Sequence, residues 1–230
     1  MKGNLGVALY PPHVTIAGPN CARFRRERDY QRLVSHDFMH IYSVAIDVIR
    51  GCWLTFAIVW LLAAVWTERS VYRESRSQRL RYTLPIVAAY FLLINGGRML
   101  YPLNLRVVPR TAIVAWAGMI LCVAGLGFAI WARVVIGRNW SGTVTLKEDH
   151  QLIERGPYRL VRHPIYTGIL SMFVATAILL GHLAGSIGVV IVFASFWSKL
   201  IREEKVMLNQ FPDKYGAYRQ RVKRLIPFVL

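Results

Sequence analysis

Five runs of mostly apolar residues, most of them long enough to cross a lipid bilayer, dominate this 230-residue chain. They are residues 48–66, 84–101, 112–136, 165–180 and 184–201. Backbone polar groups find no water in the hydrocarbon core of a bilayer, so an apolar run of about 20 residues satisfies them by forming a helix. The sequence therefore predicts an all-α integral membrane protein with about five transmembrane helices.

Only Gly181, His182 and Leu183 separate the last two apolar runs. So short a connection makes the two helices antiparallel neighbours, and we expect a C-terminal helical hairpin. The run at 165–180 is short for a full crossing. Small residues in the third run are expected to mark close contact with another helix. They are Gly118, Gly125 and Gly127.

Positive charge is concentrated between the apolar runs. The formal net charge is +17, and Lys and Arg residues crowd the segments 67–82 and 133–164 and the tail from Lys199 onward. Cytoplasmic flanks of membrane helices carry such an excess, so we expect these three segments to face the cytoplasm. Residues 1–40 are also basic, which leaves four or six spans, or a start at Met39, as alternatives. Nucleic-acid binding is disfavoured, because no recognition module accompanies the charge.

These features divide the chain into three parts. Residues 1–43 form a polar N-terminal segment, residues 44–110 hold the first two transmembrane helices, and residues 111–230 form a core. Within the core, a polar loop at 137–164 follows the first of three transmembrane helices, and a tail at 202–230 follows the last. The three cysteines form no C-x-x-C pair and the six histidines show no ligand spacing, so neither a disulfide framework nor a metal site is predicted.

Residues 150–166 carry the densest set of functional groups and lie directly before the fourth apolar run. The Gly-Pro pair at 156–157 predicts a turn. His163 is biased toward extended backbone by Pro164, which itself suits the first turn of a helix. The start of that helix offers free N–H groups to a carboxylate or phosphate, and Arg162 adds a forked donor beside it. An interfacial loop whose Arg and Tyr residues only anchor it would have a similar composition.

A second polar cluster continues the last apolar run out of the membrane. At helical spacing Glu204 shares a stripe with Trp197 and Leu200, so it lies on the apolar face. A carboxylate there is costly without a partner, which makes Glu204 either a functional residue or the partner of a loop arginine. Glu203 follows Lys199 by four residues, and we expect an ion pair between them.

These motifs occur in an order that resembles one family, the isoprenylcysteine carboxyl methyltransferases, and more loosely the phospholipid N-methyltransferases. Both are membrane-embedded enzymes that use S-adenosylmethionine. The resemblance covers about residues 125–230. The residues that carry it are Gly156-Pro157-Tyr158, Arg162-His163-Pro164, Tyr166, Glu203-Glu204, Tyr215, Tyr218, Arg221 and Pro227-Phe228.

The resemblance implies that residues 111–230 are a methyltransferase core and that S-adenosylmethionine binds between the loop and the exit helix, at the cytoplasmic face. Cofactor contacts would come from His150, Leu152, Ile153, Gly156, Tyr158, His163, Pro164, Tyr166, Glu203 and Glu204. Catalytic roles would fall to Arg162, Glu204 and Arg221. Arg221, with Tyr215 or Tyr218, would fold the tail over the site, and a lipophilic substrate would enter from the bilayer between helices.

The methyl acceptor stays open at this level. The carboxylate of an isoprenylcysteine or a similar prenylated thiol compound needs no general base. A phospholipid amine or a small thiol must lose a proton, for which Glu204 is the candidate acceptor.

Two other classes of protein remain as alternatives. Membrane reductases of the sterol reductase type share a similar Arg-His-Pro-x-Tyr ending and use NADPH, but they are generally longer. A non-enzymatic scaffold or small transport protein is the other alternative. The first two apolar runs hold few charges for an ion path, since Asp47 and Arg50 are expected to pair with each other.

Overall fold

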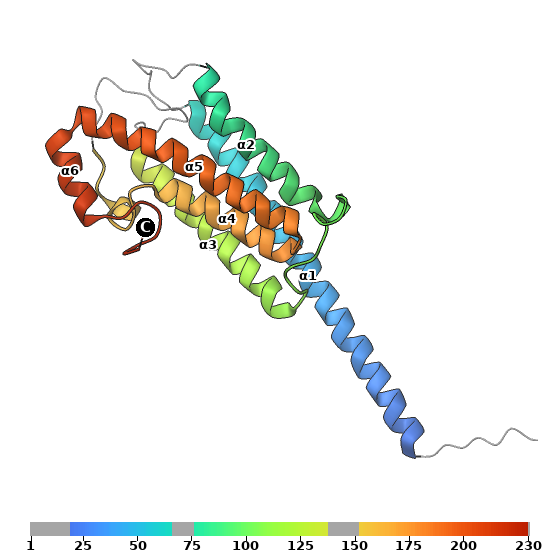
Figure 1. The fold of residues 1–230 in the computed structure, drawn as a ribbon. Coiled ribbons are helices and arrows are strands. Elements are labelled where there is room, and N and C mark those ends of the chain that lie inside the picture. Colours follow the sequence, from blue (N-terminus) through green and yellow to red (C-terminus); the bar gives the residue numbers. More distant parts are fainter. Residues whose placement is uncertain (1–18, 66–75, 138–151, 230) are drawn as a thin grey trace, which may run out of the picture. The chain divides into compact units, whose positions relative to one another are not determined.

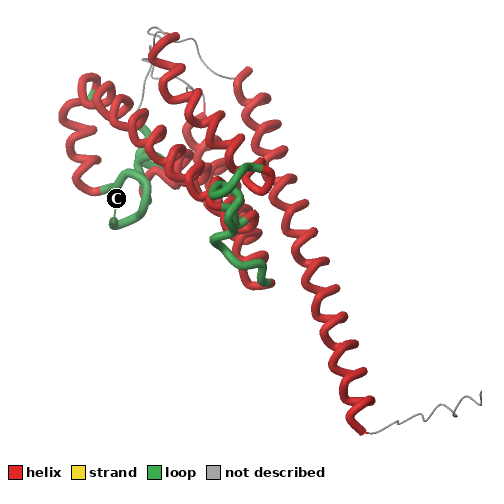
Figure 2. The backbone as a smooth tube through the Cα atoms, turned by 45° about the vertical axis from the view of Figure 1, so that its right-hand side comes forward, coloured by secondary structure: helices red, strands yellow, loops and turns green. Residues whose placement is uncertain are grey.

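The computed structural model describes residues 19–65, 76–137 and 152–229, and all regular structure in these ranges is helical (Figure 2). The helices are α1 (Pro19–Val65), α2 (Arg76–Asn95), η1 (Gly96–Arg98), α3 (Ala112–Ile136), η3 (Gly156–Arg159), α4 (Pro164–Leu180), α5 (Leu183–Gln210) and α6 (Pro212–Arg221). The chain divides into two compact units, Met1–His40 and Ile41–Leu230, and the contacts described below lie within the second.

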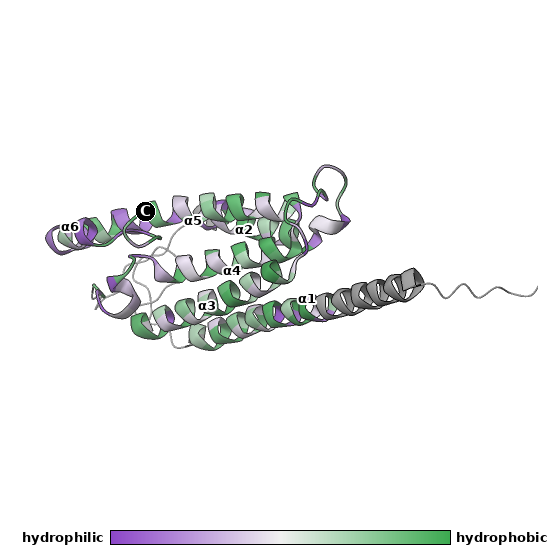
Figure 3. Ribbon diagram, turned by 90° about the horizontal axis from the view of Figure 1, so that it is seen from below, coloured by the Kyte–Doolittle hydropathy of each residue, from purple (hydrophilic) through white to green (hydrophobic). Residues whose placement is uncertain are grey.

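Three helices are long and apolar enough to cross a membrane, over Met39–Ala64, Ala112–Ile136 and Leu183–Gln210. These spans confirm an all-helical integral membrane protein. The expected second and fourth spans fall short by the same measure, because α2 opens with basic turns and α4 has only 17 residues. Hydrophobic residues predominate along α3 and in the span of α1, whereas α6 is largely hydrophilic (Figure 3).

In the second unit, α4 packs against both α3 and α5, and α5 packs against α2 (Figure 1). Two glycines bring α3 and α4 into backbone contact. A Cβ added at Gly168 would lie 2.5 Å from the Gly125 carbonyl oxygen, and one added at Gly125 would lie 2.8 Å from the Gly168 carbonyl oxygen. Gly118 also faces α4, but Gly127 faces open space, so the expectation of close packing was wrong for Gly127.

The bounds of α3 match the third apolar run because polar groups stop the helix at both ends. The Thr111 hydroxyl accepts a hydrogen bond from the Val114 amide, which caps the N-terminus. At the other end the buried Arg133 donates to the carbonyl oxygens of Gly137, at 2.7 Å, and of Ala63, at 2.8 Å. One guanidinium thus satisfies carbonyl groups at the C-terminal ends of both α1 and α3.

The predicted C-terminal hairpin is confirmed, with Gly181 and His182 as its link. Gly181 has a φ of 71°, a left-handed conformation that commonly ends a helix. The link is held by the segment before α3, because the Val107 amide donates to the Gly181 carbonyl oxygen at 2.8 Å. The turn between α4 and α5 therefore lies at the opposite end of α4 from the polar loop.

Two helix bounds differ from the sequence predictions. The second helix ends at Asn95 rather than at residue 101, because Gly96 and Gly97 interrupt it and Gly96 lies close to the start of α5. The first helix begins at Pro19, within the segment expected to be polar and separate from the span. A search for apolar runs detects only the part of a helix that suits lipid, so it missed this extension.

Candidate active site

The end of the polar loop, the exit end of α5 and the C-terminal tail meet at one place. The tail runs beside the segment that precedes α4, where the Arg162 amide donates to the Lys223 carbonyl oxygen at 2.8 Å. The His163 amide donates to the Arg224 carbonyl oxygen at 3.0 Å, and the Thr167 hydroxyl donates to the Leu225 carbonyl oxygen at 2.8 Å. Backbone pairing therefore sets the register between loop and tail.

Glu204 lies at the centre of this region, and its side chain is only 4% exposed. Its Oε1 accepts from Arg162 Nε at 2.9 Å and from Arg162 Nη2 at 2.7 Å. Arg224 approaches Oε2 at 3.2 Å, and His163 Nε2 lies 3.3 Å from Oε1. Pairing of Glu204 with a loop arginine, one of the two alternatives left open by the sequence, is observed, and a second arginine joins it from the tail.

Arg162 connects three segments through one guanidinium. Besides Glu204 of α5, it donates through Nη1 to the carbonyl oxygens of Arg219, at 3.2 Å, and of Val222. Removing either partner of such a buried ion pair leaves an uncompensated charge and costs about 3–5 kcal/mol. Arg162 and Glu204 thus hold α5, the end of α6 and the tail together.

Glu203 has a different environment from that of its neighbour. Its Oε1 accepts a hydrogen bond from the Tyr166 hydroxyl at 2.6 Å and lies 3.8 Å from Lys199 Nζ, which confirms the predicted pair. Its Oε2 lies 3.7 Å from His163 Nδ1. The Glu203 side chain is 22% exposed, so this carboxylate keeps room for a further cationic partner.

Aromatic rings support the two carboxylates. Tyr166 stacks on Phe196 with ring centroids 4.8 Å apart. Lys199 Nζ lies 4.9 Å from the ring centroid of Tyr82 on α2 and 5.4 Å from that of Tyr166. Contact with ring faces stabilises a desolvated ammonium group. The lysine is therefore held beside Glu203 by elements far apart in the sequence.

The earlier part of the loop packs against the end of α3. Tyr158 is buried, and its carbonyl oxygen accepts a hydrogen bond from the Tyr218 hydroxyl at 2.6 Å. Burial raises the pKa of Tyr218, which keeps this donor protonated. Ile153 packs against Tyr158 and Ala132, and Gly156 has a φ of 61° that a side chain would strain. The predicted turn at 156–157 is confirmed as the start of η3.

The structure separates the predicted site residues into two neighbouring groups. The cluster around the two glutamates is made by Arg162, His163, Tyr166, Glu203 and Glu204, with Pro164 at the first position of α4 as predicted. The group at the end of α3 is made by Ile153, Gly156 and Tyr158. Leu152, next to Ile153 in the sequence, is half-buried, as is Ile153. His150 lies outside the described residues.

Arg221 lies apart from the glutamate cluster. Its Nη2 pairs with Glu154 Oε2 at 2.9 Å, and its side chain is 66% exposed. This contact ties the end of α6 to the loop, as the Tyr218 hydroxyl also does. The tail therefore folds onto the loop, although Arg221 itself does not reach Glu204.

Sequence reasoning missed Lys199, Arg224 and Tyr82 as members of the site. Lys199 was expected only as the ion-pair partner of Glu203. The sequence could not single out Arg224, because a tail rich in arginine and lysine does not show which of its arginines reaches the site. Tyr82 reaches the site only through the packing of α2 on α5. Among the described residues, no group of three or more His, Cys, Asp or Glu side chains is arranged to hold a metal ion.

The residues present suit S-adenosylmethionine, whose charged amino-acid end and apolar adenine require unlike surroundings. The partly exposed Glu203 carboxylate matches an ammonium group, and the Tyr166 hydroxyl already orients it. The half-buried apolar side chains of Leu152 and Ile153 match an adenine ring. These polar and apolar groups lie on the loop and on α5, the two segments between which the sequence resemblance places S-adenosylmethionine.

Comparison with known proteins agrees with this arrangement. Residues 113–214 match the family described as phospholipid methyltransferase. The chain is 32% identical over 119 residues to a probable protein-S-isoprenylcysteine O-methyltransferase of Oryza sativa subsp. indica, covering 50% of this chain and 62% of that protein. It is 31% identical over 115 residues to protein-S-isoprenylcysteine O-methyltransferase A of Arabidopsis thaliana, covering 49% of this chain and 58% of that protein.

A third relative and one solved structure extend the comparison. The protein-S-isoprenylcysteine O-methyltransferase of Schizosaccharomyces pombe is 35% identical over 101 residues, which is 43% of each chain. The structure of a eukaryotic intramembrane Ras methyltransferase, isoprenylcysteine carboxyl methyltransferase, superposes with a TM-score of 0.46 at 23% identity, covering 68% of this chain and 55% of that one. The chain thus spans less than two thirds of the length of these relatives, and the resemblance predicted for about residues 125–230 is confirmed as far as residue 214.

Proposed function

We propose that this protein is an integral membrane methyltransferase that uses S-adenosylmethionine and methylates a lipophilic acceptor, the carboxylate of an isoprenylcysteine or a similar prenylated thiol compound. The observation that carries the proposal is the contact between Arg162-His163 and Glu203-Glu204. These two motifs are about 40 residues apart in the sequence, and they pack against each other as parts of one site. The similarity of residues 113–214 and of the curated relatives supports the same activity.

The charge of the cluster favours an anionic acceptor. Three fixed cations, Arg162, Lys199 and Arg224, surround two carboxylates, those of Glu203 and Glu204. Arg162 and Arg224 both lie against Glu204, so the excess positive charge is on that side of the cluster, where it attracts a carboxylate, while Glu203 stays open to the ammonium of the cofactor. A carboxylate also needs no proton acceptor before it attacks a methyl group.

Glu204 fits a positioning role better than that of a general base. Both of its oxygens are occupied by guanidinium groups, so a proton taken up there would break contacts that hold the tail. The guanidinium of Arg162 likewise donates its hydrogen bonds to Glu204 and to the carbonyl oxygens of Arg219 and Val222. We propose that these two residues shape the site and that the groups facing the ligands are the partly exposed Glu203 and His163.

S-adenosylmethionine, when bound, supplies a methyl group already activated by its sulfonium. Glu203 and Tyr166 would hold the ammonium of its amino-acid end, and Leu152, Ile153 and Tyr158 would cover the adenine. The work left to the chain is to align the acceptor and to exclude water. The tail is hydrogen-bonded to the backbone of Arg162 and His163, and it is therefore placed to exclude water.

We further propose five membrane spans, with the loop and tail at the cytoplasmic face. Three spans meet the length and apolarity that a crossing needs. Antiparallel packing of α4 on α5 and of α2 beside them supports a crossing by the shorter helices as well. The basic loop and tail support the orientation. A lipophilic substrate would then enter between helices from the bilayer.

A second candidate acceptor is a phospholipid amine, because the matching family is that of phospholipid methyltransferases. An acceptor panel separates the candidates. Purified protein in mild detergent would receive S-adenosylmethionine labelled on its methyl group. The acceptors would be an S-farnesylated N-acetylcysteine, its carboxamide, phosphatidylethanolamine and a long-chain alkyl thiol.

We expect label only in the farnesylated carboxylate, as a base-labile ester. The carboxamide is the matched control, because it keeps the isoprenoid and loses only the nucleophile. Label in phosphatidylethanolamine alone would replace the carboxylate with the amine as acceptor. Label in none of the four, from protein that binds S-adenosylmethionine, would reject all of these acceptors.

A further inference from the structure

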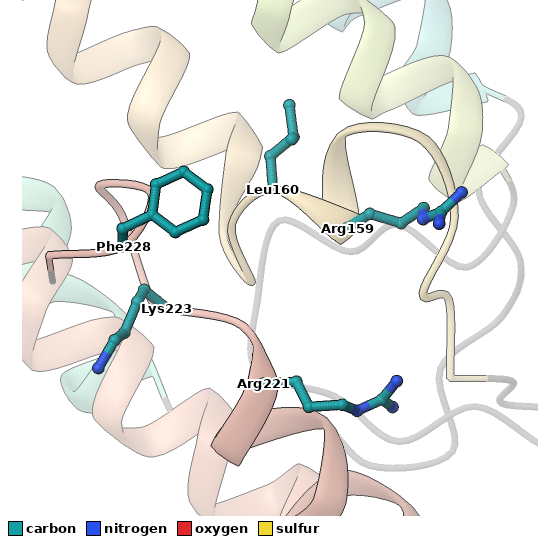
Figure 4. A pocket seen from close by; sticks show the side chains of 5 residues that line it. All are labelled: Arg159, Leu160, Arg221, Lys223 and Phe228. Atoms are coloured by element: carbon teal, nitrogen blue, oxygen red, sulfur yellow. The ribbon is translucent and has the colours of Figure 1, made fainter.

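A hollow of about 190 Å³ opens beside the tail, and neither Glu203 nor Glu204 is among the residues that line it (Figure 4). It is lined by Arg159, Leu160, Arg221, Lys223 and Phe228. Hydrogen bonds join the two sides of the hollow. The segment that follows Leu160 pairs with the tail, because the Arg162 amide donates to the Lys223 carbonyl oxygen. η3 and α6 supply the two arginines, so the hollow exists only when the tail is folded onto the loop.

The positive charge of the hollow is largely uncompensated. Arg221 pairs with Glu154, but within the described ranges neither Arg159 nor Lys223 lies at ion-pair distance from a carboxylate. Three cations at the rim of one concave surface therefore share one acidic partner. Each Lys or Arg near a membrane surface adds to the attraction for anionic lipid.

Exposed apolar side chains adjoin these cations. Phe228 is 91% exposed, and Leu160, Ile226 and Val229 are also exposed. Large apolar groups so close to basic ones are typical of a segment that lies in the headgroup region of a bilayer. A small free anion would use the cations and leave these apolar side chains in water. A phospholipid would use both.

We propose that the hollow binds the headgroup of an anionic phospholipid. The phosphate would lie among Arg159, Arg221 and Lys223, and the acyl chains would cover Leu160 and Phe228. Lipid bound there stabilises the folded position of the tail, because the hollow is assembled from loop and tail together. This inference concerns a surface outside the glutamate cluster and does not rest on the proposed methyl transfer.

The test measures lipid binding to the full chain in non-ionic detergent by native mass spectrometry, with phosphatidylglycerol, phosphatidylcholine and inorganic phosphate as probes. The variant Arg159→Gln/Lys223→Gln removes two charges from the hollow. The matched control, Lys205→Gln/Lys214→Gln, removes two charges from exposed positions on α5 and α6. We expect the hollow variant to bind phosphatidylglycerol roughly tenfold more weakly, and the control to change it less than about twofold.

The remaining arms distinguish a phospholipid site from a small-anion site and from general surface charge. Phe228→Ser should also weaken phosphatidylglycerol binding and leave phosphatidylcholine binding unchanged. Equal losses in the hollow variant and the control would reduce the effect to general surface charge and overturn the proposal. Competition by millimolar inorganic phosphate as effective as that by the lipid would identify a simple anion site instead. If the double variant fails to fold, Lys223→Gln and Phe228→Ser, both at exposed positions, decide the outcome.

Discussion

Polar side chains from the loop and the tail meet at the Glu204 carboxylate, near the end of the apolar helix α5. Three of them, Arg162, Arg224 and His163, face Glu204 directly. Such a cluster contributes little net stability compared with an apolar replacement, but it is sensitive to loss of one member. Its value is positional, because loop, helix and tail can meet in only one register.

We therefore expect Glu204→Gln to lower the free energy of unfolding by about 3–5 kcal/mol, since the buried Arg162 and the half-buried Arg224 lose their counter-charge. Thermal unfolding in mild detergent measures the change. Asp213→Asn is the matched control, because Asp213 lies at an exposed position in the first turn of α6, outside the spans, and its loss should cost less than about 1 kcal/mol. Equal effects of the two variants would show that the Glu204 cluster does not hold the tail.

Among the helices, the closest contact is that of α3 with α4 at Gly125 and Gly168. It fixes where the N-terminal end of α4, with Pro164 and Tyr166, lies relative to the end of α3, against which Tyr158 packs. The loop groups and the glutamate cluster are thereby held in a constant relation. Glycines at such contacts let helix backbones approach in membranes, where packing rather than burial from water drives association.

Gly168→Ala is accordingly expected to destabilise the protein by about 1–3 kcal/mol, because the new methyl group would overlap the Gly125 carbonyl oxygen. Gly127→Ala serves as its control, since a Cβ at Gly127 meets no atom within 4 Å. Unfolding of both variants in the same detergent gives the comparison. A Gly168→Ala protein as stable as the control would mean that α3 and α4 are less closely packed than described.

The elements differ in how far the sequence predicts them, for physical reasons. α3 was predicted to within a residue because Thr111 and Gly137 end an uninterrupted apolar run. The end of α2 was missed because the apolar character outlasts the helix, which breaks at Gly96 and Gly97. In the site, the pair of Glu203 with Lys199 followed from helical spacing, and the pair of Glu204 with a loop arginine was one of two alternatives. Arg224 and Tyr82 could not follow, since their places depend on the path of the tail and on the packing of α2.

For the molecule as a whole, the glutamate cluster lies near the end of the last span, and the described end of the loop, residues 152–163, and the tail lie around it. A lipophilic substrate and a charged cofactor would therefore meet at the boundary between bilayer and water. This placement suits a methyl transfer in which the lipophilic substrate stays in the bilayer and the charged cofactor stays in water. The likeness of residues 113–214 to methyltransferases and the pairing of the two motifs in space support the same activity.

The central claim is that the loop and exit helix bind S-adenosylmethionine, and calorimetric titration of the purified protein tests it most directly. NADPH is titrated in parallel. Glu203→Gln removes the partly exposed carboxylate, and Asp213→Asn on α6 controls for loss of an exposed carboxylate elsewhere. We predict micromolar binding of S-adenosylmethionine that weakens at least about tenfold in Glu203→Gln only, and no heat from NADPH. Folded protein that binds NADPH and not S-adenosylmethionine, or that binds neither, would contradict the account.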